Sequence, residues 1–176
     1  MTRRLRRWRR HRQLLGEAPG RLPSARRWHQ LRLDELIDAQ AAQARFTDAR
    51  VARLATVTTD GAAHVVPCCF AVLDNGTVVS AVDGKPKSTA ALRRLDNIAA
   101  NPRVSLVVDH YDDDWSHLWW VRLDGVAEII HAGDAYEAAL DALVANYEQY
   151  RTMRPTGAVI AISPTQWRSW SGTPDL

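Results

Sequence analysis

Two lysines lie in a short basic turn near the middle of the chain, and this turn could bind an anion. Lys85 and Lys87 are the only lysines in the 176-residue protein, and Ser88 or Thr89 follows at the expected N-cap of a helix. Free N–H groups at a helix N-terminus, with a hydroxyl and two ammonium groups beside them, suit a phosphate. The alternative is that the lysines are solvated turn residues and the hydroxyl an ordinary helix cap. The turn is therefore a candidate clamp for a phosphate-bearing cofactor.

A strand before this turn and a helix after it are expected to hold it in place. β-Branched residues fill positions 77–82, directly after an Asp-Asn-Gly turn signal at 74–76. Leu92, Leu95 and Ile98 recur at a spacing of three, which predicts a helix with one buried stripe. The clamp would then join the end of a strand to the start of a helix.

Further strands are predicted on both sides of this stretch. Residues 50–59 and 62–73 flank an Asp-Gly turn, and with residues 77–82 they predict an antiparallel meander of three strands. Pro67 cannot donate to a ladder, so a bulge or a sheet edge is expected there, and Pro164 predicts a bend or an edge near the middle of the last strand. The remaining predicted strands are 104–108, 118–130 and 158–170.

Two more helices are predicted, over residues 33–46 and 133–150, the second with an apolar face. The members of that face are Tyr136, Ala139, Leu140, Leu143, Val144 and Tyr147. With about six strands, the order of elements predicts a mainly β, α+β fold, a small antiparallel barrel whose closure removes exposed edges.

The first 32 residues differ in composition from the rest of the chain. They hold eleven arginines and one acidic residue, whereas the remainder carries more acidic than basic side chains. We expect a disordered, arginine-rich tail over residues 1–32, followed by one domain over residues 33–176. We expect the tail to be dispensable; the alternatives are a tether to nucleic acid or to an anionic membrane, and an extension created by a misplaced start codon.

The remaining reactive side chains do not form a familiar catalytic set. Cys68 and Cys69 are adjacent, which predicts small apolar residues in a reducing compartment, and hence a cytoplasmic protein. The acidic run at 112–114 predicts a solvated loop and no metal site. No Ser-His-Asp set, glycine-rich nucleotide loop or Walker sequence occurs. This pattern favours a cofactor that brings its own reactivity.

Three segments carry a resemblance to a known family: RVARLATVTTDGAAHVVPCCFAV, GKPKSTAALRRLDNIAANPRVSLVVDHYDDDW and LWWVRLDGVAEI. They resemble the pyridoxamine 5′-phosphate oxidase-like split β-barrel family, and more narrowly its coenzyme F420-dependent (deazaflavin) branch. The resemblance covers residues 36–170 and implies an FMN-binding split-barrel fold, a homodimer with cofactor sites at its interface, and hydride transfer between reduced F420 and a small organic substrate. FMN is the alternative cofactor, in an oxidase or flavin reductase, and a non-catalytic protein that binds a cofactor or haem is the other alternative.

Carried over residue by residue, the resemblance implies a set of cofactor-binding residues. Lys85, Lys87 and Ser88 would hold the phosphate or acidic tail, and Arg94 and Asn97 would help to hold the polar side chain of the cofactor. The alternative for Arg94 is a solvent-facing position on the helix.

The resemblance also implies that the predicted strand over residues 62–73 runs along the cofactor ring. His64 and Pro67 lie on this strand, where the resemblance implies that backbone groups meet the ring edge; the alternative for His64 is a surface strand position. Trp119 and Trp120 should face opposite sides of a strand, so one would enter the core, and Trp115 or Trp119 could line a substrate pocket or a subunit interface. The sequence indicates neither the substrate nor a proton donor.

Overall fold

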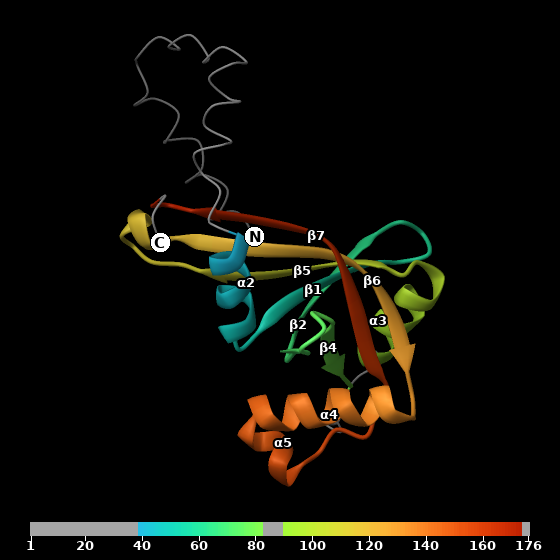
Figure 1. The fold of residues 1–176 in the computed structure, drawn as a ribbon. Helices are drawn as coiled ribbons and strands as arrows, with labels where there is room; N and C mark the ends of the chain where they lie inside the picture. Colours follow the sequence, from blue (N-terminus) through green and yellow to red (C-terminus); the bar gives the residue numbers. More distant parts are fainter. Residues whose placement is uncertain (1–38, 83–89, 174–176) are drawn as a thin grey trace, which may run out of the picture. The chain divides into compact units, whose positions relative to one another are not determined.

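The computed structural model describes residues 39–82 and 90–173, in which an antiparallel sheet curls on itself with helices packed against it (Figure 1). Its strands are β1 (Ala52–Val57), β2 (Ala63–Cys68), β3 (Ala71–Val72), β4 (Val78–Ala81), β5 (Arg103–His110), β6 (Trp119–Ile130) and β7 (Val159–Ser171). The helices are α2 (Ala39–Asp48), α3 (Ala90–Ala100), α4 (Asp134–Asn146) and α5 (Glu148–Thr152), with a 3₁₀ turn η2 (Trp115–His117). None of these helices is long and apolar enough to cross a membrane.

The strand order explains why the sheet must curl. It runs β2-β1-β5-β6-β7-β4-β3, so β2 and β3 are the two edges. In the chain, however, only Cys69 and Phe70 separate these strands, and three residue steps span at most roughly 10 Å. The edges must therefore approach each other, which confirms the predicted split barrel, with seven strands in the described residues where about six were expected.

Both turns of the predicted three-strand meander are confirmed, but its second strand is divided into β2 and β3 at Cys69 and Phe70. β1 and β2 form the expected hairpin, from Ala52 opposite Cys68 to Val57 opposite Ala63. The chain then leaves β2, and β4 pairs with β3 and with β7, which follows about 80 residues later. The turn signals therefore predict both hairpins, but they carry no information about the second neighbour of β4, which is the distant strand β7.

Both predicted effects of proline are present. Pro67 lies on β2, an edge strand, where a missing N–H group costs no ladder bond. Near Pro164 the register between β6 and β7 shifts: Asp124 pairs with Gln166, the next pair is Gly125 with Pro164, and Thr165 is left over as a bulge. A Cβ at Gly125 would lie 2.7 Å from the backbone oxygen of Ser163, so this close approach requires glycine.

Strand alternation divides the sheet into an inner and an outer face. Leu54, Leu106 and Leu123 are cross-strand partners on the inner face, and all three are fully buried. Phe46 of α2 packs onto this core, with its ring centroid 5.0 Å from those of Phe70 and Trp167. The outer face carries the alternate residues, among them Ala55, Ser105 and Asp124.

A second apolar cluster lies where α4 packs against β3, β4 and β7 (Figure 1). The predicted apolar face of this region is confirmed, because Leu140 and Leu143 are buried and Tyr136 and Val144 pack against the cluster. The predicted single helix is, however, divided at Tyr147, where α4 ends and α5 begins.

Tyr147 also holds the seam, which we define as the Cys69–Phe70 link between the two sheet edges. Its hydroxyl accepts a hydrogen bond from the Phe70 N–H at 3.0 Å and lies 2.9 Å from the carbonyl oxygens of Phe70 and Arg50. The Arg50 guanidinium stacks over the Tyr147 ring at 4.7 Å. One side chain therefore ties the seam to the segment that leads into β1.

Candidate functional site

Helix α3 turns polar side chains toward the sheet. Arg94 is 8% exposed and Asn97 is 4% exposed, and both share the buried side of α3 with Ile98. Positions 94, 97 and 98 lie on one face of a helix because they are three and four residues apart. The alternative in which Arg94 faces the solvent is therefore wrong.

The strands beneath α3 supply matching polar groups. Five polar or charged residues are buried in the described part of the chain, and four of them belong to this region: Thr56 of β1, Ser80 of β4, Arg94 and Asn97. Asn97 Nδ2 donates a hydrogen bond of 2.9 Å to Thr56 Oγ1. Thr56 Oγ1 in turn lies 3.4 Å from Nδ1 of His64, its cross-strand partner on β2. We call Asn97, Thr56 and His64 the polar relay.

Arg94 lies beside a second group of these residues. Burial raises the pKa of the Cys68 thiol to about 11, and this rise is partly offset by a hydrogen bond with Ser80 and by the positive charge of Arg94. The guanidinium Nε of Arg94 is buried without a hydrogen-bond partner among the residues that the structure describes. No described acidic side chain lies within salt-bridge distance of Arg94. A buried cation without a counter-charge marks a place where an anion would be stabilised.

The structure links two of the predicted site residues, His64 and Asn97, through Thr56, and it places a third, Arg94, on the same buried face of α3 as Asn97. Pro67, also predicted, lies on the outer face of β2 and is exposed, so its side chain does not join them. Lys85, Lys87 and Ser88 lie outside the described residues and stay predictions.

The tryptophans predicted to line a pocket or an interface lie elsewhere in the fold. Trp119 pairs with His110 at the C-terminal end of β5, whereas β1, the strand that carries Thr56, pairs with β5 near Ser105. Trp119 packs against the core, with the His110 ring at 6.1 Å and the Arg45 guanidinium at 5.4 Å from its centroid. Trp115 is 71% exposed, so it is free to contact a partner but does not touch the polar relay.

The acidic run forms part of a capped turn. Asp114 caps η2 by accepting a hydrogen bond from the Ser116 N–H at 3.0 Å. Asp112 Oδ2 lies 3.6 Å from His117 Nδ1 and 4.0 Å from His110 Nε2. No group of three or more metal-ligating side chains is arranged to hold an ion within residues 39–82 and 90–173.

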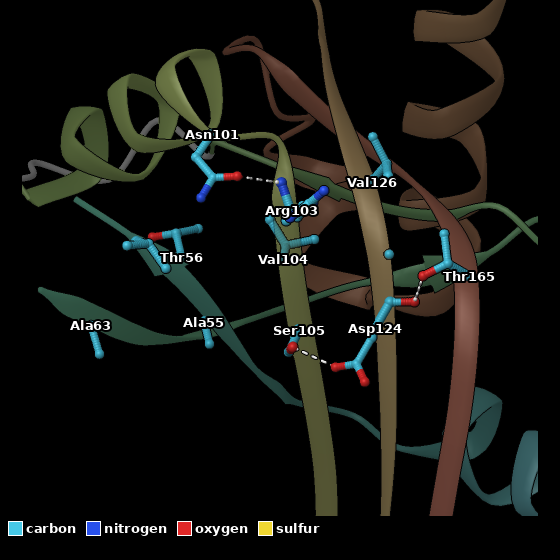
Figure 2. A pocket seen from close by; sticks show the side chains of 12 residues that line it. Ala55, Thr56, Ala63, Asn101, Arg103, Val104, Ser105, Asp124, Val126 and Thr165 are labelled. Carbon is cyan, nitrogen blue, oxygen red and sulfur yellow. Dashed lines mark hydrogen bonds between the residues drawn. The ribbon is translucent and has the colours of Figure 1, made fainter. Parts of the chain in front are cut away.

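An open groove of about 500 Å³ crosses the outer face beside the C-terminal end of α3 (Figure 2). Asp124 is central to it: its carboxylate accepts a hydrogen bond of 2.5 Å from Ser105 Oγ, and its backbone oxygen accepts one of 3.0 Å from Thr165 at the bulge. The rest of the lining is mainly apolar, with Ala55, Val57, Ala63, Val104 and Val126. Thr56 borders the groove, but its side chain faces inward, so the groove and the polar relay lie on opposite faces of β1.

Sequence reasoning missed Thr56, Ser80 and the pair of Ser105 and Asp124. Threonine and serine are common in alternating strands, and nothing in their spacing distinguishes a buried hydroxyl from an exposed one. A signal for Thr56 and Ser80 exists only in three dimensions, because Thr56 is recognised by its bond to Asn97 of α3 and Ser80 by its bond to Cys68, whose thiol senses the charge of Arg94.

Comparisons with known proteins agree with this architecture. The model of the family described as pyridoxamine 5′-phosphate oxidase matches residues 39–171. No curated protein sequence gives a match.

Three solved structures illustrate the similarity of fold. The conserved hypothetical protein Rv2991 of Mycobacterium tuberculosis is 22% identical, with a TM-score of 0.66 over 80% of this chain and 89% of that one. A protein of Mesorhizobium loti named as FAD-binding is 23% identical, with a TM-score of 0.59 over 76% and 94%. A heme binding protein of Mycobacterium smegmatis is 22% identical, with a TM-score of 0.56 over 78% and 60%.

These identities show a shared fold, and the family model covers almost every residue that the structure describes. The fold of this family accounts for the curled seven-stranded sheet and for the helix whose polar face packs against it. The chain belongs to the pyridoxamine 5′-phosphate oxidase family.

Proposed function

We propose that this protein is a coenzyme F420-dependent oxidoreductase, which transfers a hydride between reduced deazaflavin and a small organic substrate. The observation that carries the proposal is Arg94, a cation that is 8% exposed and has no described acidic partner. Burying an unpaired charge is costly, so a site that retains one is suited to an anionic ligand.

The residues present fit the charged part of such a cofactor. Arg94 lies in the second turn of α3, and Lys85, Lys87 and Ser88 precede that helix in the sequence. Together they would hold the phosphate and acidic tail, because guanidinium, ammonium and hydroxyl groups all donate to phosphate oxygens. FMN also carries a phosphate, so this donor set supports binding of either cofactor.

The protein's own contribution to the reaction would be to bind and orient. Arg94 anchors the charged end of the cofactor, and the polar relay offers hydrogen bonds from the wall formed by β1 and β2. The bound cofactor supplies the hydride chemistry. The surrounding residues fix its distance to the substrate and exclude water, which can account for much of the acceleration without an acid–base pair.

We further propose that the protein acts as a homodimer in the cytoplasm. Val57, Val65 and Val126 are 37%, 58% and 45% exposed and lie close together on the outer face, next to the groove of Figure 2. Exposed apolar side chains gathered on one sheet face favour burial against a partner, here a second copy. Sedimentation velocity should give a dimer that V65D weakens and M153D, at an exposed site beyond α5, does not; a monomeric wild type would contradict this.

The test of function is a titration of ligand-free protein with F420, FMN and hemin, followed by quenching of tryptophan fluorescence. Arg94→Gln should weaken F420 binding by about 10- to 100-fold, since a hydrogen bond to a charged group contributes about 1.5–3 kcal/mol. Arg93→Gln is the matched control, because Arg93 is the adjacent residue of α3 and is exposed. Lys85→Ala/Lys87→Ala tests the predicted clamp in the same assay.

The three ligands separate the alternatives. Selective binding of F420 that is lost in Arg94→Gln and kept in Arg93→Gln supports the proposal, and selective FMN binding would make the protein a flavin enzyme. Binding of hemin alone would favour a non-catalytic haem protein. If wild type binds none of them at micromolar concentration, the proposed function is wrong.

A further inference from the structure

Counting the donors and acceptors of the polar relay assigns a direction to each of its hydrogen bonds. Thr56 is 2% exposed and Asn97 is 4% exposed, so water does not compete for either side chain. The Asn97 amide nitrogen can only donate, and it donates to Thr56 Oγ1 at 2.9 Å. The single hydroxyl proton of Thr56 is therefore left to point elsewhere.

Two acceptors lie within reach of that proton, both belonging to His64. The backbone oxygen and the ring Nδ1 are each 3.4 Å from Thr56 Oγ1. In an antiparallel ladder hydrogen-bonded pairs alternate, and the Thr58 N–H already donates to the Ala62 oxygen at 2.9 Å. The pair two residues along, Thr56 with His64, is then also a bonded pair, so the His64 oxygen already accepts from the ladder. Nδ1 is the acceptor that has no other donor among the described residues.

We propose that Asn97 and Thr56 are positioning residues that hold His64 in the neutral tautomer with its proton on Nε2. A ring whose Nδ1 accepts a hydrogen bond must carry its proton on Nε2 when it is uncharged. No described residue accepts from this Nε2–H, and His64 is only half-buried, so the donor is available to a ligand.

This inference rests on the proposed function and specifies one contact within it. An uncharged N–H donor suits a ring carbonyl oxygen of the deazaflavin or flavin, whereas a phosphate would favour the doubly protonated, charged imidazole. The buried cation of the site is already supplied by Arg94. His64 therefore recognises the ring, and Arg94 recognises the anion.

The experiment reads the tautomer directly. Long-range ¹H–¹⁵N spectra of the full chain at pH 8, with ¹⁵N-labelled histidine, distinguish the two neutral tautomers, and His64→Gln identifies the His64 signals among the 6 histidines. We expect an unprotonated Nδ1 and a protonated Nε2 in wild type. Thr56→Val should give a mixture of tautomers, and Thr56→Ser, which restores a hydroxyl, should return the wild-type spectrum.

The same variants test the contact with the ligand. Thr56→Val and His64→Phe should each weaken binding of F420, or of FMN if that is the cofactor, by about three- to tenfold, as expected for one neutral hydrogen bond. Thr56→Ser should bind as wild type does, and circular dichroism checks that each variant is folded.

Each alternative result has a distinct meaning. A proton on Nδ1 in free wild type, or a tautomer that Thr56→Val leaves unchanged, overturns the positioning role. A doubly protonated His64 in the complex would show that it contacts phosphate instead of the ring. If no cofactor binds, the proposed function and the ligand contact both fail, while the tautomer of the free protein still decides whether Thr56 positions His64.

Discussion

Replacing Tyr147 by phenylalanine removes one oxygen atom from the seam of the barrel, and this change should be far more costly than its size suggests. The ring, 6% exposed, keeps its packing against the cluster beneath α4. What is lost is the hydroxyl that joins Phe70 to the carbonyl oxygen of Arg50, in the segment that leads into β1. Burial raises the pKa of Tyr147, so the hydroxyl is protonated and can both donate and accept at neutral pH.

The magnitude follows from counting the groups left without a partner. The Phe70 N–H loses its acceptor at 3.0 Å, and the two carbonyl oxygens at 2.9 Å lose the single proton that they share. Phe70 is 1% exposed, so water cannot replace the lost partner without opening the seam. Since each unsatisfied buried group costs about 1–3 kcal/mol, we expect Tyr147→Phe to lower the free energy of unfolding by about 2 to 4 kcal/mol.

Urea denaturation followed by circular dichroism measures this difference, and Tyr136→Phe is the matched control. The Tyr136 hydroxyl makes one hydrogen bond of 3.2 Å, to the Gly157 oxygen, in a half-buried site, so its loss should cost less than about 1 kcal/mol. In thermal melts the Tyr147 variant should lose roughly 7 to 14 °C in Tm. Equal stability of the two variants would show that the seam is not held by this hydroxyl, and the reasoning would be refuted.

Two further predictions concern the sheet and its first hairpin. Gly125→Ala should destabilise the fold by about 1–3 kcal/mol, because the new Cβ would lie 2.7 Å from the Ser163 oxygen and 2.8 Å from Ile162 Cγ2; an unchanged urea midpoint would mean that the bulge can shift to make room. The Thr58 hydroxyl, followed by the backbone N–H groups of Asp60 and Ala62, lowers the pKa of Asp60 below its ordinary value of 3.8. The stabilisation that comes from this lowered pKa is present above the ordinary pKa and is lost as the pH falls through the lower folded-state pKa. Between about pH 5 and about pH 2, Asp60→Asn should therefore lose less stability than wild type does. Parallel pH profiles of the two proteins would contradict this prediction.

The sequence could predict the strands, their faces and the two local hairpins, but not the pairings between strands far apart in the chain. Alternation in β1 places Leu54 and Thr56 inside and Ala55 outside, and this alternation is visible in the sequence itself. The pairing of β4 with β7 is not visible, because it joins residues about 80 positions apart and periodicity carries no information about partners. The sequence likewise predicts one continuous strand through the two-residue seam, since Cys69 and Phe70 are as apolar as the strands they join.

The candidate site was predictable only in part, for a related reason. The resemblance indicates His64, Arg94 and Asn97; the structure links His64 to Asn97 through Thr56 and buries Arg94 on the same face of α3 as Asn97. An apolar stripe at Leu95 and Ile98 predicted which side of the helix is buried, but hydrophobic spacing assigns arginine to solvent by default. Arg94 is buried because α3 packs against the sheet beside the inward hydroxyl of Thr56, and that placement is a property of the fold and not of the helix.

The strand order also has a consequence for synthesis on the ribosome. β4 lies between β3 and β7, and β3 contributes only Ala71 and Val72, so most of the hydrogen-bonding capacity of β4 waits for a strand made last. Until residues 159–162 have left the exit tunnel, the nascent chain can form the hairpin of β1 and β2 and add β5 and β6, but the half that carries Ser80 stays unpaired. A ribosome stalled before β7 would therefore display an exposed, apolar β4 edge that chaperones could bind, and the split of the barrel, with the buried polar groups of its site, would form only at the end of translation.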